Sequence, residues 1–215
     1  MPRNQPIQYS LLANTAKACA MSGCEKPRHK LAKHCRMHDE RRRRWGTPRS
    51  RCWRSSDIGT YADVAEDFIT ANAEHAGIKA AEAWLDAVLE AAAERTKEPF
   101  ADLATRAFSG LHGAGIDGHA LLVRCVAVTL YLTELREGEQ ELEPFVRNLG
   151  HHCLRPVVPA LAKGERQRQY SQALGNFLYS QLSKLLIHIV AHKRQLDANK
   201  RTFESAAAEP FDGTL

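Results

Sequence analysis

Residues 118–136 read GHALLVRCVAVTLYLTELR, a stretch that is apolar on nearly every side when it is arranged as a helix. A helix of this kind belongs in the centre of a helical bundle, where other helices cover all of its faces. Arg124, two threonines and Glu134 interrupt the stretch, so it lacks the roughly 18 consecutive apolar residues of a transmembrane helix. We therefore predict the central helix of a bundle and no membrane partner.

Segments on both sides of this helix also have a helical period. Before it, we predict a helix that begins at residues 55–57, a second helix after a break at 75–77, and a third over 99–111. After it, a short helix begins near Pro144 and a long one covers 165–198. No part of the body shows the alternation of a β-strand, so we predict an all-α fold for it.

The long last helix carries an apolar stripe that extends from Leu174 to Leu196. At 1.5 Å per residue the stripe is about 33 Å long, roughly the diameter of a small domain. We expect the part from Leu185 to Leu196 to overhang the bundle and to support a homodimer or a protein partner. The alternative is that the first two helices of the body cover the stripe and leave a monomer.

The two parts of the chain carry charge of opposite sign. Residues 1–56 contain 14 lysines and arginines against 3 acidic residues, a net charge of +11, whereas residues 57–215 contain 16 against 22, a net charge of −6. Such a split favours a nucleic-acid-binding arm joined to an acidic body. The N-terminus has no signal-peptide pattern, so we expect a cytoplasmic chain whose thiols stay reduced.

Residues 19–54 contain almost no aliphatic side chains, so this segment cannot bury enough apolar surface to fold unaided. Its cysteines and one histidine follow the pattern Cys19-x4-Cys24-x10-Cys35-x2-His38. Paired thiol and imidazole ligands at such spacings suit a structural Zn²⁺ ion. We therefore predict one Zn²⁺ ion held by these four residues. Three nearby residues are alternative ligands: His29, His34 and Cys52.

The residues around the second ligand pair resemble a small zinc motif of phage and mobile-element proteins, many of which carry an HNH endonuclease domain. In that motif Cys-x4-Cys is followed by Cys-x2-His, an arginine-rich helix with a tryptophan, and a Gly-Asp-Pro ending. Arg41, Gly46 and Pro48 stand at matching distances after the histidine. Thr47, however, stands in place of the aspartate of the motif, and Trp45 lies three positions later than the tryptophan of the motif. The resemblance covers about 35 residues, and the body lacks the strands and the His/Asn signature of an HNH domain.

An arginine-rich segment overlaps and follows this motif. Arginine matches phosphate oxygens and the acceptor edge of guanine. Successive residues of a helix are rotated by about 100°, so the four consecutive arginines cannot all face one groove. We therefore expect some of them to contact phosphates and one or two to contact bases. Alternatives are a solvated basic tail and a patch that docks on the acidic body. The predicted nucleic-acid-binding residues are Arg36, Arg41, Arg42, Arg43, Arg44, Trp45, Arg49, Arg51 and Arg54.

The tryptophans of this segment have more than one interpretation. Trp45 and Trp53 alternate with arginines, and their rings are suited to stacking on exposed bases. Trp45 is equally suited to covering the zinc module.

The histidines and cysteines of the body form no catalytic motif. His188 and His192 lie four residues apart but lack the glutamate of a metalloprotease site, so we expect a packing role. We also expect residues 151–153 (His-His-Cys) to pack or cap, and Cys125 to be a small buried hydrophobic side chain. No phosphate-binding loop or nucleophile elbow occurs in the sequence, so an enzyme is not favoured.

Together these patterns predict a mainly α protein with a small zinc-stapled basic module before an all-α helical bundle. The predicted parts are a lead-in segment (1–18), the zinc-binding module (19–50), a linker (51–57), the helical domain (58–198) and a flexible tail (199–215). We expect a zinc-dependent nucleic-acid-binding accessory or regulatory protein of a phage, plasmid or other mobile element, with DNA favoured over RNA. Two alternatives are a nuclease-like enzyme with its active site in the helical body, and an RNA- or ribosome-associated zinc protein.

Overall fold

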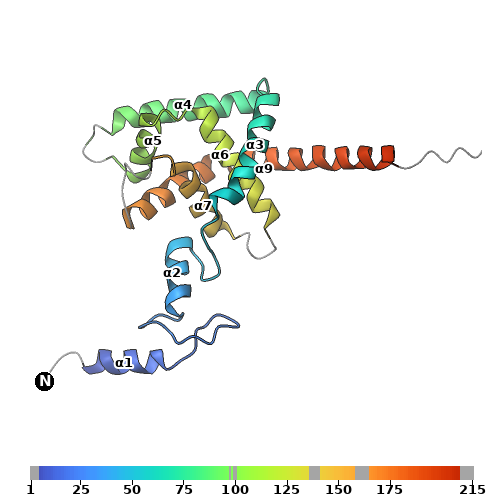
Figure 1. The fold of residues 1–215 in the computed structure, drawn as a ribbon. Coiled ribbons are helices and arrows are strands. Elements are labelled where there is room, and N and C mark those ends of the chain that lie inside the picture. The colour runs from blue at the N-terminus through green and yellow to red at the C-terminus, as the bar shows by residue number, and fades with distance from the viewer. Residues whose placement is uncertain (1–4, 97, 99–100, 136–140, 158–164, 209–215) are drawn as a thin grey trace, which may run out of the picture.

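The computed structural model describes residues 5–96, 98, 101–135, 141–157 and 165–208 (Figure 1). These residues form eight α-helices, and within them there is no β-strand, only an isolated antiparallel bridge between Ala18 and Pro27. The predicted mainly α fold is confirmed. The helices are α1 (Gln5–Thr15), α2 (Arg36–Trp45), α3 (Ser55–Ala71), α4 (Ala76–Arg95), α5 (Leu103–Gly113), α6 (Gly118–Glu134), α7 (Leu142–Leu154) and α9 (Glu165–Ala208).

Helix α6 is the centre of the body, as its apolar sequence predicts. It packs against α3, α4, α7 and α9 (Figure 1). Leu121, Leu122 and Val126 are completely buried, and so is Cys125. A helix without a polar face is stable here because its neighbours cover it on all sides.

The third helix of the body begins later than predicted, at Leu103 instead of residue 99. The carboxylate of Asp102 accepts a hydrogen bond from the backbone N–H of Thr105 at 2.8 Å and thereby caps the first turn. A capping aspartate satisfies a backbone donor that the helix itself leaves unpaired, so the cap sets the start.

Helices α7 and α9 cross at very short range through one glycine on each helix. A Cβ atom added to Gly150 would collide with the backbone of Ser171 and Gly175, and one added to Gly175 would collide with the carbonyl of Val146. Backbone atoms cannot rotate aside as a side chain can, so only glycine allows this approach.

Residues 51–54, predicted to be part of a linker, are anchored to α7. The backbone N–H of Trp53 donates to Asn148 Oδ1 at 3.0 Å, and His152 Nε2 donates to the carbonyl of Trp53 at 3.1 Å. Trp53 is 5% exposed, and its ring lies beside the rings of Tyr131 and Phe145. The predicted stacking of Trp53 on bases is therefore wrong, because the ring belongs to the core of the body.

The long helix α9 is covered over the first part of the predicted overhang (185–196) and exposed over the last part. Leu186, Ile189 and Val190 are buried, whereas Leu196, at the end of the predicted stripe, is 45% exposed. The cover comes from the ends of two other helices: the ring of Phe68 in α3 lies against His192, and Arg194 donates to the carbonyl of Thr133 in α6 at 2.9 Å. Self-association through this helix stays a prediction.

Helix α9 continues to Ala208, ten residues beyond the predicted end at 198, and its last part projects away from the bundle (Figure 1). Residues 199–208 contain neither glycine nor proline, so nothing in them breaks a helix before Pro210. Residues 209–215 of the predicted tail lie outside the described residues.

Within the described part of the chain, no single helix has both the length and the apolar composition to cross a membrane. Helices α5 and α6 meet these criteria only as a pair, and they are bent by 116° where they join.

His119, in the first turn of α6, connects three helices by hydrogen bonds. Its Nδ1 lies 2.7 Å from Glu82 Oε1 in α4, and its Nε2 lies 2.8 Å from Glu66 Oε1 in α3. These hydrogen bonds with Glu66 and Glu82 raise the pKa of His119 above its usual value of 6.5. In its protonated form the imidazole donates to both carboxylates and joins α6 to α3 and α4.

Replacing Gly150 with alanine should lower the free energy of unfolding by at least about 2 kcal/mol, because the new methyl group meets backbone. Gly59 is the matched control, since it lies in α3 and a Cβ there meets nothing within 4 Å. Gly59→Ala should instead stabilise the protein by up to about 1 kcal/mol through helix propensity. Chemical denaturation measures both changes, and equal effects of the two variants would contradict the close crossing.

The stability that His119 supplies should depend on pH. Because its folded pKa lies above the unfolded value of 6.5, its contribution is fully present below about 6.5 and is lost as pH rises through the folded pKa. The difference in unfolding free energy between the wild type and His119→Gln should therefore shrink from pH 6 to pH 9. His188→Gln, at an exposed position of α9, is the control. A difference for His119→Gln that stays constant over this range would refute the prediction.

Candidate metal centre

The four predicted metal ligands come from two short segments that the backbone holds together. Cys19 and Cys24 flank a tight turn in which Gly23 has φ +75°, a left-handed conformation that glycine adopts without strain. A short antiparallel pairing closes this segment, with the N–H of Cys19 bonded to the carbonyl of Lys26 at 2.9 Å. Cys35 precedes the first residue of α2, and His38 follows one turn later on the same face.

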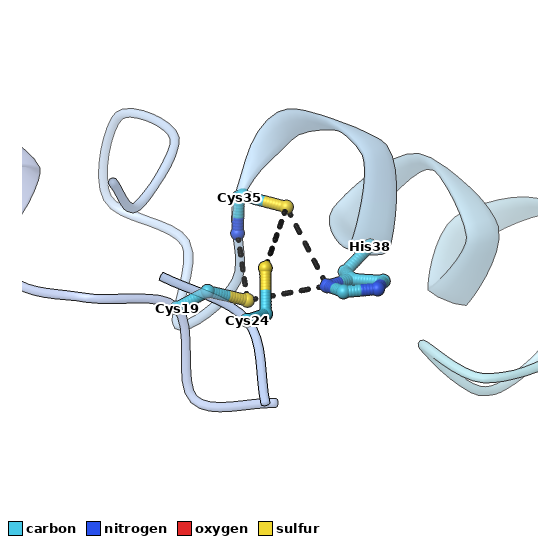
Figure 2. Close-up of side chains that lie close together, drawn as sticks. All are labelled: Cys19, Cys24, Cys35 and His38. Carbon is cyan, nitrogen blue, oxygen red and sulfur yellow. Dashed lines mark hydrogen bonds between the residues drawn. The ribbon is translucent and has the colours of Figure 1, made fainter. Parts of the chain in front are cut away.

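The four side chains converge on one point (Figure 2). Cys19 Sγ lies 3.3 Å from His38 Nδ1, Cys35 Sγ lies 3.5 Å from the same nitrogen, and Cys24 Sγ lies 3.9 Å from Cys35 Sγ. The metal–ligand distances of a tetrahedral zinc site imply separations of about 3.8 Å between two sulfurs and about 3.6 Å between sulfur and nitrogen. The observed spacings are those of a tetrahedral ligand cage.

The predicted ligand set is thus brought together, and the alternatives are not part of it. In the described residues, the only group of three or more potential metal ligands consists of Cys19, Cys24, Cys35 and His38, whose ligand atoms all lie within 4.8 Å of one another. His29 and His34 lie in the loop between the two ligand pairs, and Cys52 lies beside Trp53 at the body. These four residues can bind one metal ion.

The thiols of this cluster influence each other's protonation. Burial raises the pKa of Cys19, but hydrogen bonds from the backbone N–H groups of Cys35 and Met21 and from histidine side chains outweigh it and lower this pKa to about 5. For Cys24, a hydrogen bond from the backbone of Lys26 is outweighed by burial and by the neighbouring thiols, so its pKa is raised. Two thiolates this close repel each other, and a bound cation removes that repulsion.

The helix that carries His38 also carries five arginines and two acidic residues. Asp39 is 2% exposed and forms ion pairs with Arg42 at 3.2 Å and with Arg43. These two guanidinium groups lower the pKa of Asp39 despite its burial, which raises it. Arg44 pairs with Glu40 one turn earlier. Internal pairing therefore orients three of the four consecutive arginines.

The arginines keep much of their surface open to solvent in spite of these pairs. The side chains of Arg42, Arg43 and Arg44 are 51%, 60% and 53% exposed, and Arg41 is half-buried. The remaining predicted arginines are all exposed: Arg36, Arg49, Arg51 and Arg54.

Trp45 packs on the body. Its ring contacts that of His151 in α7 edge-to-face, with 5.5 Å between the centroids. The side chain is half-buried in this contact. It therefore joins the end of α2 to the body and does not cover the metal ligands.

The sequence patterns did not predict two sets of contacts made by α2, those of Asp39 and those of Arg147. Asp39 lies three and four residues before Arg42 and Arg43, a helical spacing that does signal ion pairs. Arg147 of α7 donates to the carbonyls of Arg43 and Arg44 at 2.8 and 3.1 Å and so satisfies the last turn of α2. No local sequence pattern predicts the contact of Arg147, because more than a hundred residues separate it from its partners.

The histidines and cysteines at positions 125 and 151–153 pack in the body, as predicted, whereas among the described residues no packing contact is found for His188 on α9. His152 is buried and bonded to the carbonyl of Trp53, and burial together with the nearby His151 lowers its pKa to about 4. Cys125 and Cys153 are completely buried, with their sulfurs 3.7 Å apart. His188 and His192 are exposed on α9.

Comparison with protein-family models, with curated proteins and with solved structures found no match for this chain.

Replacing Cys24 with serine should reduce the metal content of the purified protein from one ion per chain to nearly none, because a four-ligand cage loses a thiolate. Amide exchange should accelerate in residues 17–38, while the helices of the body, whose core contains no cluster residue, keep their protection. Cys52→Ser, which removes a thiol outside the cluster, should keep the metal. Elemental analysis decides between the outcomes, and a full metal complement in Cys24→Ser would rule out the cage.

Proposed function

We propose that the chain is a zinc-stapled nucleic-acid-binding protein whose helical body carries the basic module, and that its ligand is double-stranded DNA in preference to RNA. One observation carries the proposal: two of the four metal ligands, Cys35 and His38, belong to the start of the arginine-rich helix α2. The ion that folds the segment also orients the arginines.

Zinc is the ion that this ligand set favours. Three thiols and one imidazole are borderline-soft donors, which bind Zn²⁺ in a closed tetrahedral site and suit Mg²⁺ or Ca²⁺ poorly. A closed site with four protein ligands has no open position for a water or a substrate, so its role is structural.

The positive charge of the module supports nucleic acid as its partner. Helix α2 keeps a net charge of +3 after its two acidic residues are counted, and Arg36, Arg49, Arg51 and Arg54 are exposed around it. The ion pairs with Asp39 and Glu40 use part of the donor capacity of three guanidinium groups, and each group still offers exposed N–H donors for phosphate oxygens. The alternative of a basic patch docked on the acidic body is less favoured, because these side chains face solvent.

Duplex DNA is favoured because α2 is a helix. The major groove of B-DNA admits an α-helix, and arginine forks bind the O6 and N7 atoms of guanine there. The deep, narrow major groove of A-form RNA does not admit one. An accessory or regulatory role in a phage, plasmid or other mobile element agrees with the resemblance of residues 19–48 to the zinc motif of such proteins.

The choice of variants follows from the ion pairs of α2. Removing Arg42 and Arg43 would leave the buried carboxylate of Asp39 unpaired and would destabilise the helix itself. Arg36 and Arg49 are exposed, and no described acidic side chain pairs with them. Substitution of these two arginines therefore changes the charge of the surface without opening the helix.

The double variant Arg36→Gln, Arg49→Gln should weaken binding to a duplex DNA of about 20 base pairs. If each arginine neutralises one phosphate, the slope of log K against log salt should become less negative by about 1.8. The charge-matched control is Arg166→Gln, Lys184→Gln, at two exposed positions of α9, which should leave the slope unchanged. Fluorescence anisotropy at four or more salt concentrations measures this, and an equal loss in both double variants would refute the assignment to the module.

Incubation of the same DNA with the protein and Mg²⁺ separates binding from the nuclease-like alternative. We expect the duplex to be bound and to stay intact. Cleavage that depends on residues of the body would favour the enzyme instead.

A further inference from the structure

A cavity of about 280 Å³ lies where the end of α2 meets α7 and the first turns of α9. This volume is near the lower end of the range for small-molecule sites. Its lining includes three arginines, two aromatic rings and one serine: Arg44, Trp45, Arg147, His151, Arg168 and Ser171. The cavity exists only in the assembled protein, because it needs both the basic module and the body.

Arginines supply the charged groups of the cavity wall. Three arginines from three different helices, Arg44, Arg147 and Arg168, contribute to its wall. No carboxylate is among the described residues that line it; Glu40 and Glu143, which pair with Arg44 and Arg147, lie outside the lining. Cationic walls that surround a small volume concentrate anions there.

Two buried hydrogen-bonding groups in this wall lack a partner. Ser171 is 6% exposed, and its Oγ forms no hydrogen bond. The Nε of Arg147 is buried and equally unpaired, although the other two nitrogens of that guanidinium bond to the carbonyls at the end of α2 and to Glu143. An unsatisfied buried polar group costs about 1–3 kcal/mol, so two in one wall indicate an absent acceptor.

An aromatic surface stands beside these donors. Trp45 and His151 form an edge-to-face pair with 5.5 Å between their centroids, and both rings line the cavity. A neighbouring ring pair supplies stacking surface that a bare inorganic anion does not use but that a nucleobase does.

We propose that this cavity binds the phosphate group of a nucleotide, with Ser171 Oγ and Arg147 Nε as donors to its oxygens and with Arg44 and Arg168 as cationic partners. The phosphate can belong to a free mononucleotide or to the end of a nucleic-acid strand, and the chemistry is the same. The inference does not rest on DNA binding by the exposed arginines, because the cavity lies between the module and the body.

His151 offers an independent readout. Burial lowers its pKa, and the charge of Arg155 lowers it further. A phosphate bound in the same cavity opposes the effect of the cationic surroundings, so binding should move the pKa of His151 upward in an NMR titration.

The test uses the full-length, metal-loaded protein and isothermal titration calorimetry with three pairs of probes. AMP is compared with adenosine, a 5′-phosphorylated single-stranded hexanucleotide with its unphosphorylated form, and inorganic phosphate with chloride at equal ionic strength. We expect phosphate-bearing members to bind more tightly than their partners. Preference for AMP identifies a free nucleotide as the source, and preference limited to the phosphorylated hexanucleotide identifies a strand end.

The decisive variant is Ser171→Ala, which removes an unpartnered hydroxyl and should leave thermal stability unchanged or higher. It should weaken binding of the phosphate-bearing probe at least about tenfold, the usual loss for a hydrogen bond to a charged group. The matched control is Ser180→Ala at an exposed position of the same helix, which should change nothing.

A second pair of variants guards against an indirect effect. Arg168→Gln should weaken phosphate binding, whereas Arg166→Gln, at an exposed position in the same turn that does not line the cavity, should not. Equal binding of adenosine and AMP, or an unchanged affinity in Ser171→Ala, would mean that water alone fills the cavity and would overturn the proposal.

Discussion

The close crossing of α7 and α9 is the constraint on which the arrangement of the two parts depends. Gly150 and Gly175 let the two backbones approach to a distance that any Cβ would prevent. Arg147, Asn148 and His152 lie within one turn of Gly150 on α7, so the crossing also positions the side chains that hold the N-terminal part of the chain. One helix–helix contact thus fixes the face on which the basic module docks.

The contacts on that face make the module and the body a connected structure. Trp53 inserts its ring into the core, while Asn148 and His152 bond to its backbone N–H and carbonyl. Arg147 satisfies the carbonyls at the end of α2, where a cation also interacts favourably with the helix dipole. The metal cluster orders the start of α2, and α7 holds its end. The direction of the arginine helix is therefore defined at both termini.

The consecutive arginines of α2 both stabilise the helix through ion pairs and expose positive charge to solvent. Asp39 is buried beneath Arg42 and Arg43, and its carboxylate is stable there only because both guanidinium groups compensate its charge. The same two side chains remain more than half exposed. Ion pairs of this kind hold the guanidinium donors in fixed orientations, so these donors would lose less conformational freedom on contact with a ligand.

Local patterns in the sequence are sufficient to predict the features that depend on residues close together in the chain. The ligand spacing from Cys19 to His38 predicts the cage, since two tight turns bring the four side chains together once the segment closes. Helical periods predict the body, because an apolar face repeats every 3.6 residues wherever the helix packs. The start of α5 and the end of α9 differ from prediction because a cap and the lack of a helix breaker outweighed the hydrophobic pattern.

The roles of the tryptophans, the cover of α9 and the cavity beside Ser171 arise from contacts between residues far apart in sequence. Trp53 stands among arginines and serines, a context typical of a linker, yet its partners Tyr131 and Phe145 belong to α6 and α7. Ile189 looks like part of an overhanging stripe, yet it is buried in the core of the body. A side chain is buried or exposed according to which distant surfaces the fold brings against it, and periodicity along one helix carries no information about that.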